Sequence, residues 1–260
     1  MPDFDTNVPH IARVYDYWLG GKDNFDADRE LGERTLQAYP NLAFSVRANR
    51  AFLARTVRFL VSECGIRQFL DIGTGIPTAN NTHEVAQRLE PSSRIVYVDN
   101  DPIVLTHAQA LLTSSRDGAC DYIDADLNDP AAILAAAART LDFSQPVAVM
   151  LIAVMHFVGE DDKASAIIGT LMDACPPGSY LALSHAASDI DGEQMAEMVR
   201  RLNESSPEKT YLRDQAGVTR LFDGYDLVEP GVIRAAEWRP DSELEAKSPA
   251  ALWGGVARKG

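Results

Sequence analysis

The chain has few of the features that mark disulfide-stabilised, zinc-binding or membrane-spanning proteins. Its 260 residues include only three cysteines and no C-x-x-C pair, which favours reduced thiols over a disulfide framework or a zinc site. The longest apolar run, 147–158, is too short to cross a bilayer and is interrupted by His156. The N-terminus lacks the basic and apolar regions of a signal peptide. We therefore expect a cytoplasmic protein with no membrane partner.

A surplus of positive charge is also missing. The chain has 24 Lys and Arg against 38 Asp and Glu, a net charge of −14, so we expect no nucleic-acid partner. One modest basic cluster, Arg47, Arg50, Arg55 and Arg58, lies on a predicted helix and is either a solvated face or an anion site. No spacing of His, Asp and Glu suggests a catalytic metal, so we predict no metal site.

The stretch Phe69-Leu-Asp-Ile-Gly-Thr-Gly-Ile-Pro-Thr78 is the most informative segment that the chain does contain. Apolar residues lead to Asp71 and then to the turn Gly73-Thr74-Gly75. This pattern is typical of a buried strand that ends in a tight turn, where the backbone must approach a ligand closely.

Acidic residues also end the next two predicted strands. The apolar run 95–98 precedes Asp99, whose carboxylate is placed to accept hydrogen bonds from ribose hydroxyls. The run 122–126 ends at Asp126, which could accept from an adenine amino group while Leu127 lies on the ring. The alternative for each acid is a helix cap or a solvated loop charge. Together the strand ends predict an adenosine-type cofactor at the carboxyl edge of a parallel sheet.

The missing third glycine indicates which cofactor this is. A dinucleotide fingerprint, G-x-G-x-x-G, needs glycine where this chain has Thr78 after Pro77, so a pyrophosphate is poorly accommodated. Asp71 instead suits a cationic amino group, bound directly or through water. S-adenosylmethionine carries that amino group and an adenosine but no phosphate. It is the predicted cofactor, and a nicotinamide-dependent oxidoreductase is the alternative.

The sequence resembles the S-adenosylmethionine-dependent methyltransferases with a doubly wound sheet, and more narrowly an actinobacterial S-adenosyl methyltransferase family. The narrower resemblance covers nearly the whole chain and rests on the segments 11–25, 71–78, 98–102, 222–224 and 228–231. Pro77 stands where the general methyltransferase pattern usually has a third glycine, but the resemblance implies that proline is common there in the narrower family. We expect the cofactor to contact Tyr17, Asn24, Asp71, Gly73, Thr74, Gly75, Asp99, Asn100, Asp126, Leu127 and Ala153.

Predicted strands and helices alternate along the chain, which indicates a parallel sheet with helices on both faces. We expect an α/β fold: a doubly wound, seven-stranded, mostly parallel sheet with an N-terminal helical extension and a C-terminal antiparallel hairpin. Residues 1–63 would form a helical cap or lid, and residues 64–260 one compact methyltransferase domain. The expected strands are 67–72, 94–99, 121–125, 146–154, 179–185, 226–233 and 251–258. The expected helices are 27–37, 42–63, 82–90, 102–115, 129–139, 161–174 and 190–204.

The N-terminal block has two interpretations that are compatible. Tyr15, Tyr17 and Trp18 precede Gly20-Gly21, and aromatic residues beside a glycine pair suit a lid that closes over a ligand. The other interpretation is a helix that packs on the core and ends at a glycine cap.

His156 follows the apolar residues of the fourth predicted strand, at the end that faces the transferring methyl group. It is either a general base toward the methyl acceptor or a residue that only packs or caps backbone. We expect a methyltransferase that acts on a small molecule. A cofactor-binding sensor without transfer activity is the non-enzyme alternative, and the oligomeric state stays open.

Overall fold

The computed structural model describes residues 5–104, 106 and 114–260. The sheet in this part of the chain has eight strands in the order β3-β2-β1-β4-β5-β8-β6, with β7 also paired to β8. Its five parallel strands are β1 (Gln68–Ile72), β2 (Arg94–Asp99), β3 (Ala119–Asp124), β4 (Ala148–Ile152) and β5 (Tyr180–Ala186). The antiparallel side consists of β6 (Asp226–Leu227), β7 (Ile233–Arg234) and β8 (Leu252–Arg258). The order reverses between β1 and β4, and ligands of doubly wound sheets bind at such a switch point.

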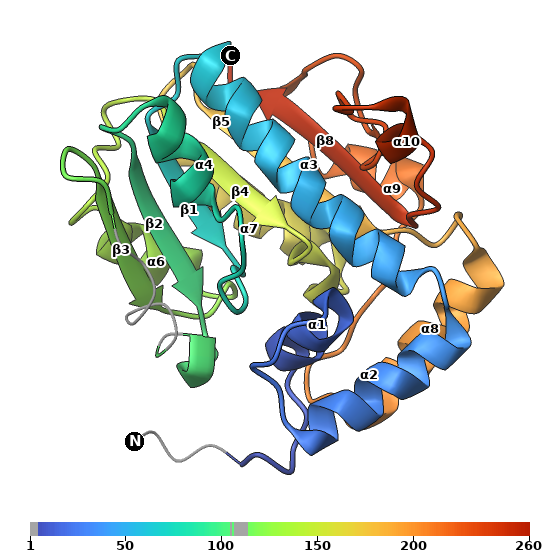
Figure 1. Cartoon of the computed structure of the whole chain (residues 1–260). Helices are drawn as coiled ribbons and strands as arrows, with labels where there is room; N and C mark the ends of the chain where they lie inside the picture. The colour runs from blue at the N-terminus through green and yellow to red at the C-terminus, as the bar shows by residue number, and fades with distance from the viewer. Residues whose placement is uncertain (1–4, 105, 107–113) are drawn as a thin grey trace.

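Helices cover both faces of the sheet and extend beyond one of its edges. In Figure 1, α3 and α4 lie on one face, α6 and α7 lie on the other, and α1, α2 and α8 gather beyond the arrowheads of the parallel strands. The N-terminal helices are α1 (Ile11–Leu19), α2 (Asp26–Ala38), α3 (Leu42–Ser62) and α4 (Thr82–Leu89). The later ones are α6 (Pro130–Ala137), the 3₁₀ turn η1 (Met155–Phe157), α7 (Asp161–Asp173), α8 (Gly192–Ser205), α9 (Gln215–Arg220) and α10 (Glu243–Ala246). None of these described helices is both long and apolar enough to span a bilayer.

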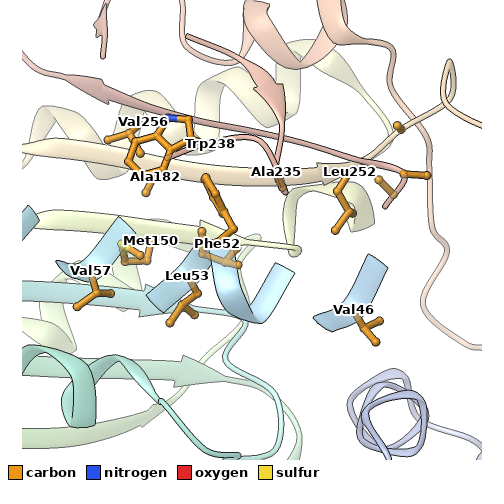
Figure 2. Packing of buried hydrophobic residues seen from close by; sticks show 14 of the residues in the cluster. Val46, Phe52, Leu53, Val57, Met150, Ala182, Ala235, Trp238, Leu252 and Val256 are labelled. Carbon is orange, nitrogen blue, oxygen red and sulfur yellow. The ribbon is translucent and has the colours of Figure 1, made fainter. Parts of the chain in front are cut away.

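The two faces of the sheet bury two separate cores. Successive side chains of a strand point to opposite faces, so Phe69 packs on the α3 side and Leu70 on the α7 side. Burial on both faces explains why the central strand β4 is an unbroken apolar run. On the α3 side, Phe52 of the helix packs near Met150 of the sheet and edge-to-face on Trp238, with 5.5 Å between ring centroids (Figure 2). Helix α3 is thus part of the central core, although it falls within the cap predicted for residues 1–63.

The predicted fold, a doubly wound and mostly parallel sheet with a C-terminal antiparallel hairpin, is confirmed. The predicted strand over 226–233 is instead two short strands, because a turn closed by the hydrogen bond from Gly231 N to Val228 O, 2.8 Å long, separates them. The helix predicted over 102–115 falls mainly on residues 105 and 107–113, which lie outside the described residues.

Candidate functional site

A cavity of about 500 Å³ lies at the carboxyl ends of the parallel strands. One part of its wall comes from the strand ends that the sequence motifs indicate. These residues are Asp71, Ile72, Gly73, Thr74, Gly75, Val98, Asp99, Asn100, Ala125, Asp126, Leu127, Asn128, Ile152 and Ala153. The sequence-predicted acids therefore lie together, as the switch-point topology requires.

The glycine turn after β1 has the backbone conformation that its sequence predicts. Gly73 and Gly75 have φ values of +74° and +62°, the left-handed region that favours glycine. A side chain at Gly73 would also meet Val154 at 2.3 Å. The Gly73 N–H donates to Val98 O at 2.8 Å, which fixes the turn against the end of β2. The turn thus lets the backbone form the cavity wall without side chains in the way.

Asp99 is a buried acid whose carboxylate is held by backbone. It is 9% exposed, and its Oδ2 accepts from Gly75 N at 2.8 Å while its Oδ1 accepts from Asp101 N at 3.0 Å. Burial raises the pKa of Asp99, and these two N–H donors oppose that rise. Each carboxylate oxygen can accept a further hydrogen bond, so this fixed group suits a diol.

Asp71 also lines the cavity, and its buried carboxylate accepts fewer hydrogen bonds from the described residues than that of Asp99. It is 4% exposed, and its Oδ2 accepts from Thr82 Oγ1 at 2.6 Å. Burial raises its pKa to about 6; Thr82 and the charge of Arg50 lower it, and Asp99 raises it further. A cation bound beside Asp71 would favour the ionised carboxylate.

The third strand end forms a more open part of the wall. Asp126 is exposed and its Oδ1 accepts from both the backbone N and the Nδ2 of Asn128, each at 2.8 Å. Leu127 is half-buried and Asn100 is exposed, and both line the cavity. The residues predicted for the adenine end are therefore brought together, with polar and apolar atoms side by side.

Ala153 begins a chain of buried hydrogen bonds that joins β4 to α1. It has a φ of +55°, and its N–H donates to Ser184 Oγ at 3.0 Å. The Ser184 hydroxyl donates to Asn49 Oδ1 at 2.5 Å, and Asn49 Nδ2 donates to the Tyr15 hydroxyl at 3.0 Å. Nothing in the sequence indicated the role of Asn49. A connected network of this kind fixes the cavity wall in one arrangement.

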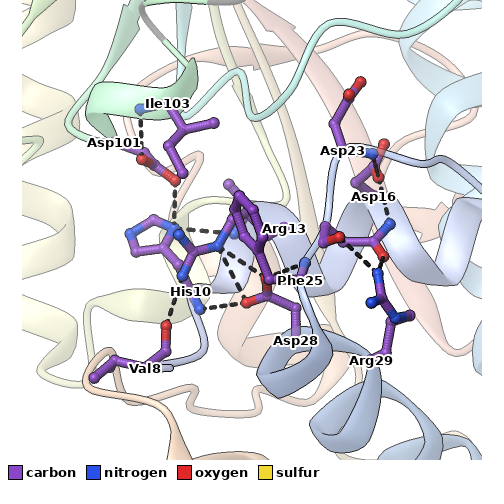
Figure 3. Close-up of polar contacts among 12 residues, drawn as sticks. Val8, His10, Arg13, Asp16, Asp23, Phe25, Asp28, Arg29, Asp101 and Ile103 are labelled. Carbon is purple, nitrogen blue, oxygen red and sulfur yellow. Dashed lines mark hydrogen bonds and ion pairs between the residues drawn. The ribbon is translucent and has the colours of Figure 1, made fainter. Parts of the chain in front are cut away.

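The segment before α1 is tied down by one fully buried acid, Asp28 (Figure 3). This carboxylate accepts from His10 N at 2.9 Å, from Arg13 Nε at 3.0 Å and from Phe25 N at 2.9 Å. His10 Nδ1 also lies 2.8 Å from Asp101 Oδ2. Burial lowers the pKa of His10, but the hydrogen bond and charge of Asp101, together with the charges of Glu208 and Asp99, raise it overall. These contacts fix α1 over the cavity.

Two of the predicted contact residues, Tyr17 and Asn24, are not part of the cavity wall. The Tyr17 hydroxyl donates to Glu33 Oε1 at 3.3 Å, and the Asn24 amide donates to Asp16 Oδ2 at 2.8 Å. Helix α1 ends at the left-handed Gly20, as the glycine-cap interpretation predicts.

The face of α1 that lines the cavity carries Tyr15 and Trp18. These residues are three apart and so lie on one side of the helix, whereas Tyr17 is rotated away from them. The cavity wall thus contains Tyr15 and Trp18 in place of the expected Tyr17. Contact of Tyr17 with the cofactor stays a prediction.

His156 also lines the cavity, within η1 directly after β4. Its Nδ1 is buried and has no hydrogen-bond partner among the described residues, and the same is true of Oγ1 in Thr210 of the cavity wall. The two segments are joined by the hydrogen bond from Tyr211 N to His156 O, at 2.8 Å. Burial, together with His185 and Arg213, lowers the pKa of His156 to about 3. The imidazole is thus neutral at physiological pH.

A buried cation lies behind this histidine. The Arg213 guanidinium donates to His185 Nε2 at 2.8 Å, so the hydrogen of the neutral ring is on Nδ1. His185 Nδ1 donates this hydrogen to Ala186 O at 2.9 Å. The ring of His185 is edge-on to that of His156, with 5.8 Å between centroids. Arg213 is paired with Asp161 at 2.8 Å. Burial, with a smaller contribution from the charge of Arg213, lowers the pKa of His185 to about 4, so this imidazole is also neutral at physiological pH.

The rest of the wall carries both polar and apolar residues. Its polar residues include His10, Ser45, Asn49, Arg50, Glu208, Lys209 and Thr210. One group of apolar residues comes from α3, α8 and the chain at the start of β8, and consists of Leu42, Val46, Leu53, Met195, Met198, Leu202, Ala251 and Leu252. We call this part of the cavity the apolar chamber. Within the described residues no three His, Cys, Asp or Glu side chains gather as a metal site would require.

Comparison with known proteins decides the family. A family model described as S-adenosyl methyltransferase matches residues 1–260. The chain belongs to this family. It is 44% identical to a DUF574 family protein from Streptomyces avermitilis MA-4680, a crystal structure that superimposes with a TM-score of 0.95 over 98% of this chain and 99% of that one. It is 42% identical to a candidate methyltransferase from Thermobifida fusca YX, with a TM-score of 0.91 over 99% and 97% of the two chains.

A more distant likeness shows the fold alone. Human N-acetylserotonin methyltransferase, solved in complex with S-adenosylmethionine, is 17% identical, with a TM-score of 0.50 over 98% of this chain and 63% of that one. A comparison with curated proteins found no match. The family assignment decides for an S-adenosylmethionine-dependent methyltransferase and against the nicotinamide alternative.

The residues around the cavity fit this cofactor. Asp99 is a fixed acceptor for a diol, Asp71 is a buried carboxylate that a cation would keep ionised, and the turn at Gly73 exposes backbone. When bound, S-adenosylmethionine supplies a methyl group activated by its sulfonium sulfur. The strand-end residues would hold its adenosine and amino-acid ends, and the apolar chamber is what remains for a methyl acceptor.

Proposed function

We propose that this methyltransferase acts on a small, largely apolar molecule that binds in the apolar chamber. The observation that carries the proposal is that this chamber and the strand-end site for the cofactor form one cavity. Met198 and Leu202 of α8 and Trp18 of α1 contribute to its wall. Such a wall suits an acceptor that is small enough to fit entirely inside the cavity.

We further propose that His156 orients the acceptor. A buried polar atom without a partner costs about 1–3 kcal/mol, and Nδ1 of His156 and Oγ1 of Thr210 are both in this state. An acceptor hydroxyl or amine that bonds to them would remove that cost. With a pKa of about 3 the imidazole is a weak base, so its main contribution is to hold the nucleophile in line with the methyl group.

The three cysteines are free thiols, which suits a cytosolic location.

The experiment is a screen followed by substitution at His156. A panel of small phenols, alcohols and amines is incubated with S-adenosylmethionine, and formation of S-adenosylhomocysteine is measured. With an acceptor from this panel, His156→Ala should lower kcat by about ten- to a hundred-fold, the worth of one buried hydrogen bond at the reacting group. His156→Asn should retain most of the activity, and the affinity for S-adenosylhomocysteine should change in neither variant.

The pH profile separates orientation from proton transfer. If His156 only orients, kcat should show no imidazole-like titration between pH 5 and 8, because its pKa is about 3. A rise in kcat through pH 6–7 that disappears in His156→Asn would instead assign it as a general base. Unchanged turnover in His156→Ala would remove it from the acceptor site altogether.

A further inference from the structure

We propose that Arg50 binds the carboxylate of the cofactor's amino-acid end. With Asp71 it then forms a site for an α-amino-acid zwitterion, in which the acid takes the ammonium group and the arginine takes the carboxylate. Asp71 alone satisfies only half of such a ligand, because a free carboxylate next to Asp71 and Asp99 would be repelled.

Arg50 is placed where this role requires it. It extends from α3 and lines the main cavity together with Asp71 and Gly75. It also lines a smaller cavity behind the glycine turn, whose wall again includes Asp71 and Gly75. Two elements far apart in sequence, α3 and the end of β1, thus bring a cation and an anion to one end of the site.

The guanidinium of Arg50 is only partly used by the protein. The three hydrogen bonds that it forms with described residues all run through Nη2, to Ala79 O at 3.3 Å, Asn80 O at 3.4 Å and Asn81 Oδ1 at 3.2 Å. Its Nε is buried without a partner in the described part of the chain, and no carboxylate there forms an ion pair with Arg50. A buried guanidinium N–H without an acceptor is costly, and a ligand carboxylate would satisfy it.

Arg50 and Asp71 interact electrostatically but do not form an ion pair with each other. The charge of Arg50 lowers the pKa of Asp71, yet the hydrogen-bond partner of Asp71 is Thr82 and those of Arg50 are in the turn at 79–81. Two opposite charges that face one cavity but do not neutralise each other are complementary to a zwitterion.

The other three arginines of the helix do not share this arrangement. Arg55 donates to Trp238 O and Ala235 O and pairs with Glu245, and Arg58 pairs with Asp241 at 2.5 Å. Arg47 is exposed and lies outside the cavity wall. Arg47 therefore provides a matched control on the same helix.

Three ligands and two variants test the proposal by calorimetry. S-adenosylhomocysteine has both the amino and the carboxylate group, its decarboxylated form has only the amino group, and 5′-methylthioadenosine has neither. Each is titrated into the unmodified chain, Arg50→Gln and Arg47→Gln. Glutamine at position 50 removes the charge but keeps an N–H donor for the turn, and thermal unfolding confirms that each variant is folded.

The expected result is non-additivity. In the unmodified chain, loss of the ligand carboxylate should weaken binding by about ten- to a hundred-fold, as for a hydrogen bond to a charged group. Arg50→Gln should weaken binding of S-adenosylhomocysteine by a similar factor, but should change binding of the other two ligands by less than about two-fold. Arg47→Gln should leave all three affinities unchanged.

The variant Asp71→Asn tests the other half of the proposed site, the interaction with the ammonium group. It should weaken S-adenosylhomocysteine and its decarboxylated form alike, because both keep the ammonium group. The proposal is overturned if Arg50→Gln weakens all three ligands by one common factor, which would mean that Arg50 only supports the turn. It is equally overturned if Arg50→Gln leaves the affinity for S-adenosylhomocysteine unchanged. No methyl acceptor takes part in these titrations, so either outcome leaves the proposed acceptor and the role of His156 untouched.

Discussion

Asp71 is a cavity residue whose protonation should link cofactor binding to pH. Its pKa is raised from 3.8 to about 6 because it is buried, and it lies among Thr82, Arg50 and Asp99. Since the folded chain holds this proton more tightly than the unfolded chain, ionisation of Asp71 opposes folding. The ligand-free protein should therefore lose some stability as pH rises from about 4 to about 6. Burial favours the protonated form of Asp71, and an ammonium group bound beside it would favour the ionised carboxylate instead.

The affinity for S-adenosylhomocysteine should accordingly fall as pH is lowered through about 6. Below this pH, binding must first remove the proton from Asp71, at a cost of about ten-fold in affinity for each pH unit. Calorimetry between pH 5 and 8 measures the effect. In Asp71→Asn the affinity should be lower and nearly independent of pH over this range. A profile that is flat in the unmodified chain would show that Asp71 does not face the amino group.

Helix α1 is held in place by a tertiary contact rather than by its own sequence. It has nine residues, fewer than an isolated helix needs for stability in water. Asp28 of α2 ties it down through His10 and Arg13, and its cavity face carries Tyr15 and Trp18. The helix packs on α2 and α3, as the core-packing interpretation predicts, and it also lines the cavity. Its closure over a ligand stays a prediction.

Asp28→Asn should destabilise the fold and loosen this helix. The substitution leaves Arg13, which is 3% exposed, buried without its ionic partner, at a cost of about 3–5 kcal/mol. Urea denaturation should report that loss, and stopped-flow measurements should show faster release of S-adenosylhomocysteine. Asp26→Asn is the control, since the Asp26 side chain is 99% exposed and its pair with Arg29 lies at the surface, worth at most about 1 kcal/mol. Equal effects of the two substitutions would argue against the tether.

For the whole molecule, the cavity lies where the sheet, α1, α3 and α8 meet, so a ligand there bridges elements from most of the chain. S-adenosylmethionine and S-adenosylhomocysteine should each stabilise the fold by about 2.7 kcal/mol at one hundred times their Kd. For a domain of this size that is a rise in Tm of roughly 5–10 °C. NAD should leave the Tm unchanged, because the turn at Thr78 lacks the third glycine that a pyrophosphate requires. Stabilisation by NAD alone would contradict the cofactor assignment.

The amino-acid sequence by itself determined the sheet and the strand-end part of the cavity wall. Asp71, Asp99 and Asp126 lie at or just after the ends of β1, β2 and β3, and a strand, its turn and its terminal acid are local features that a few adjacent residues specify. The parallel arrangement then brings all strand ends to one edge, so the acids had to lie close together. Strand 226–233 was mispredicted in detail because its interruption depends on one turn.

Only the tertiary structure decided which side chains outside the strand ends face the cavity. Tyr15 and Trp18 line it while Tyr17 does not, because the packing of α1 on α2 and α3 sets the rotation of the helix. Arg50 resembles three neighbouring arginines in sequence, and only its place beside the glycine turn distinguishes it from them. Thr210 joins His156 through a contact made by Tyr211. These positions depend on how distant segments pack together, and neither local spacing nor hydrophobic periodicity contains that information.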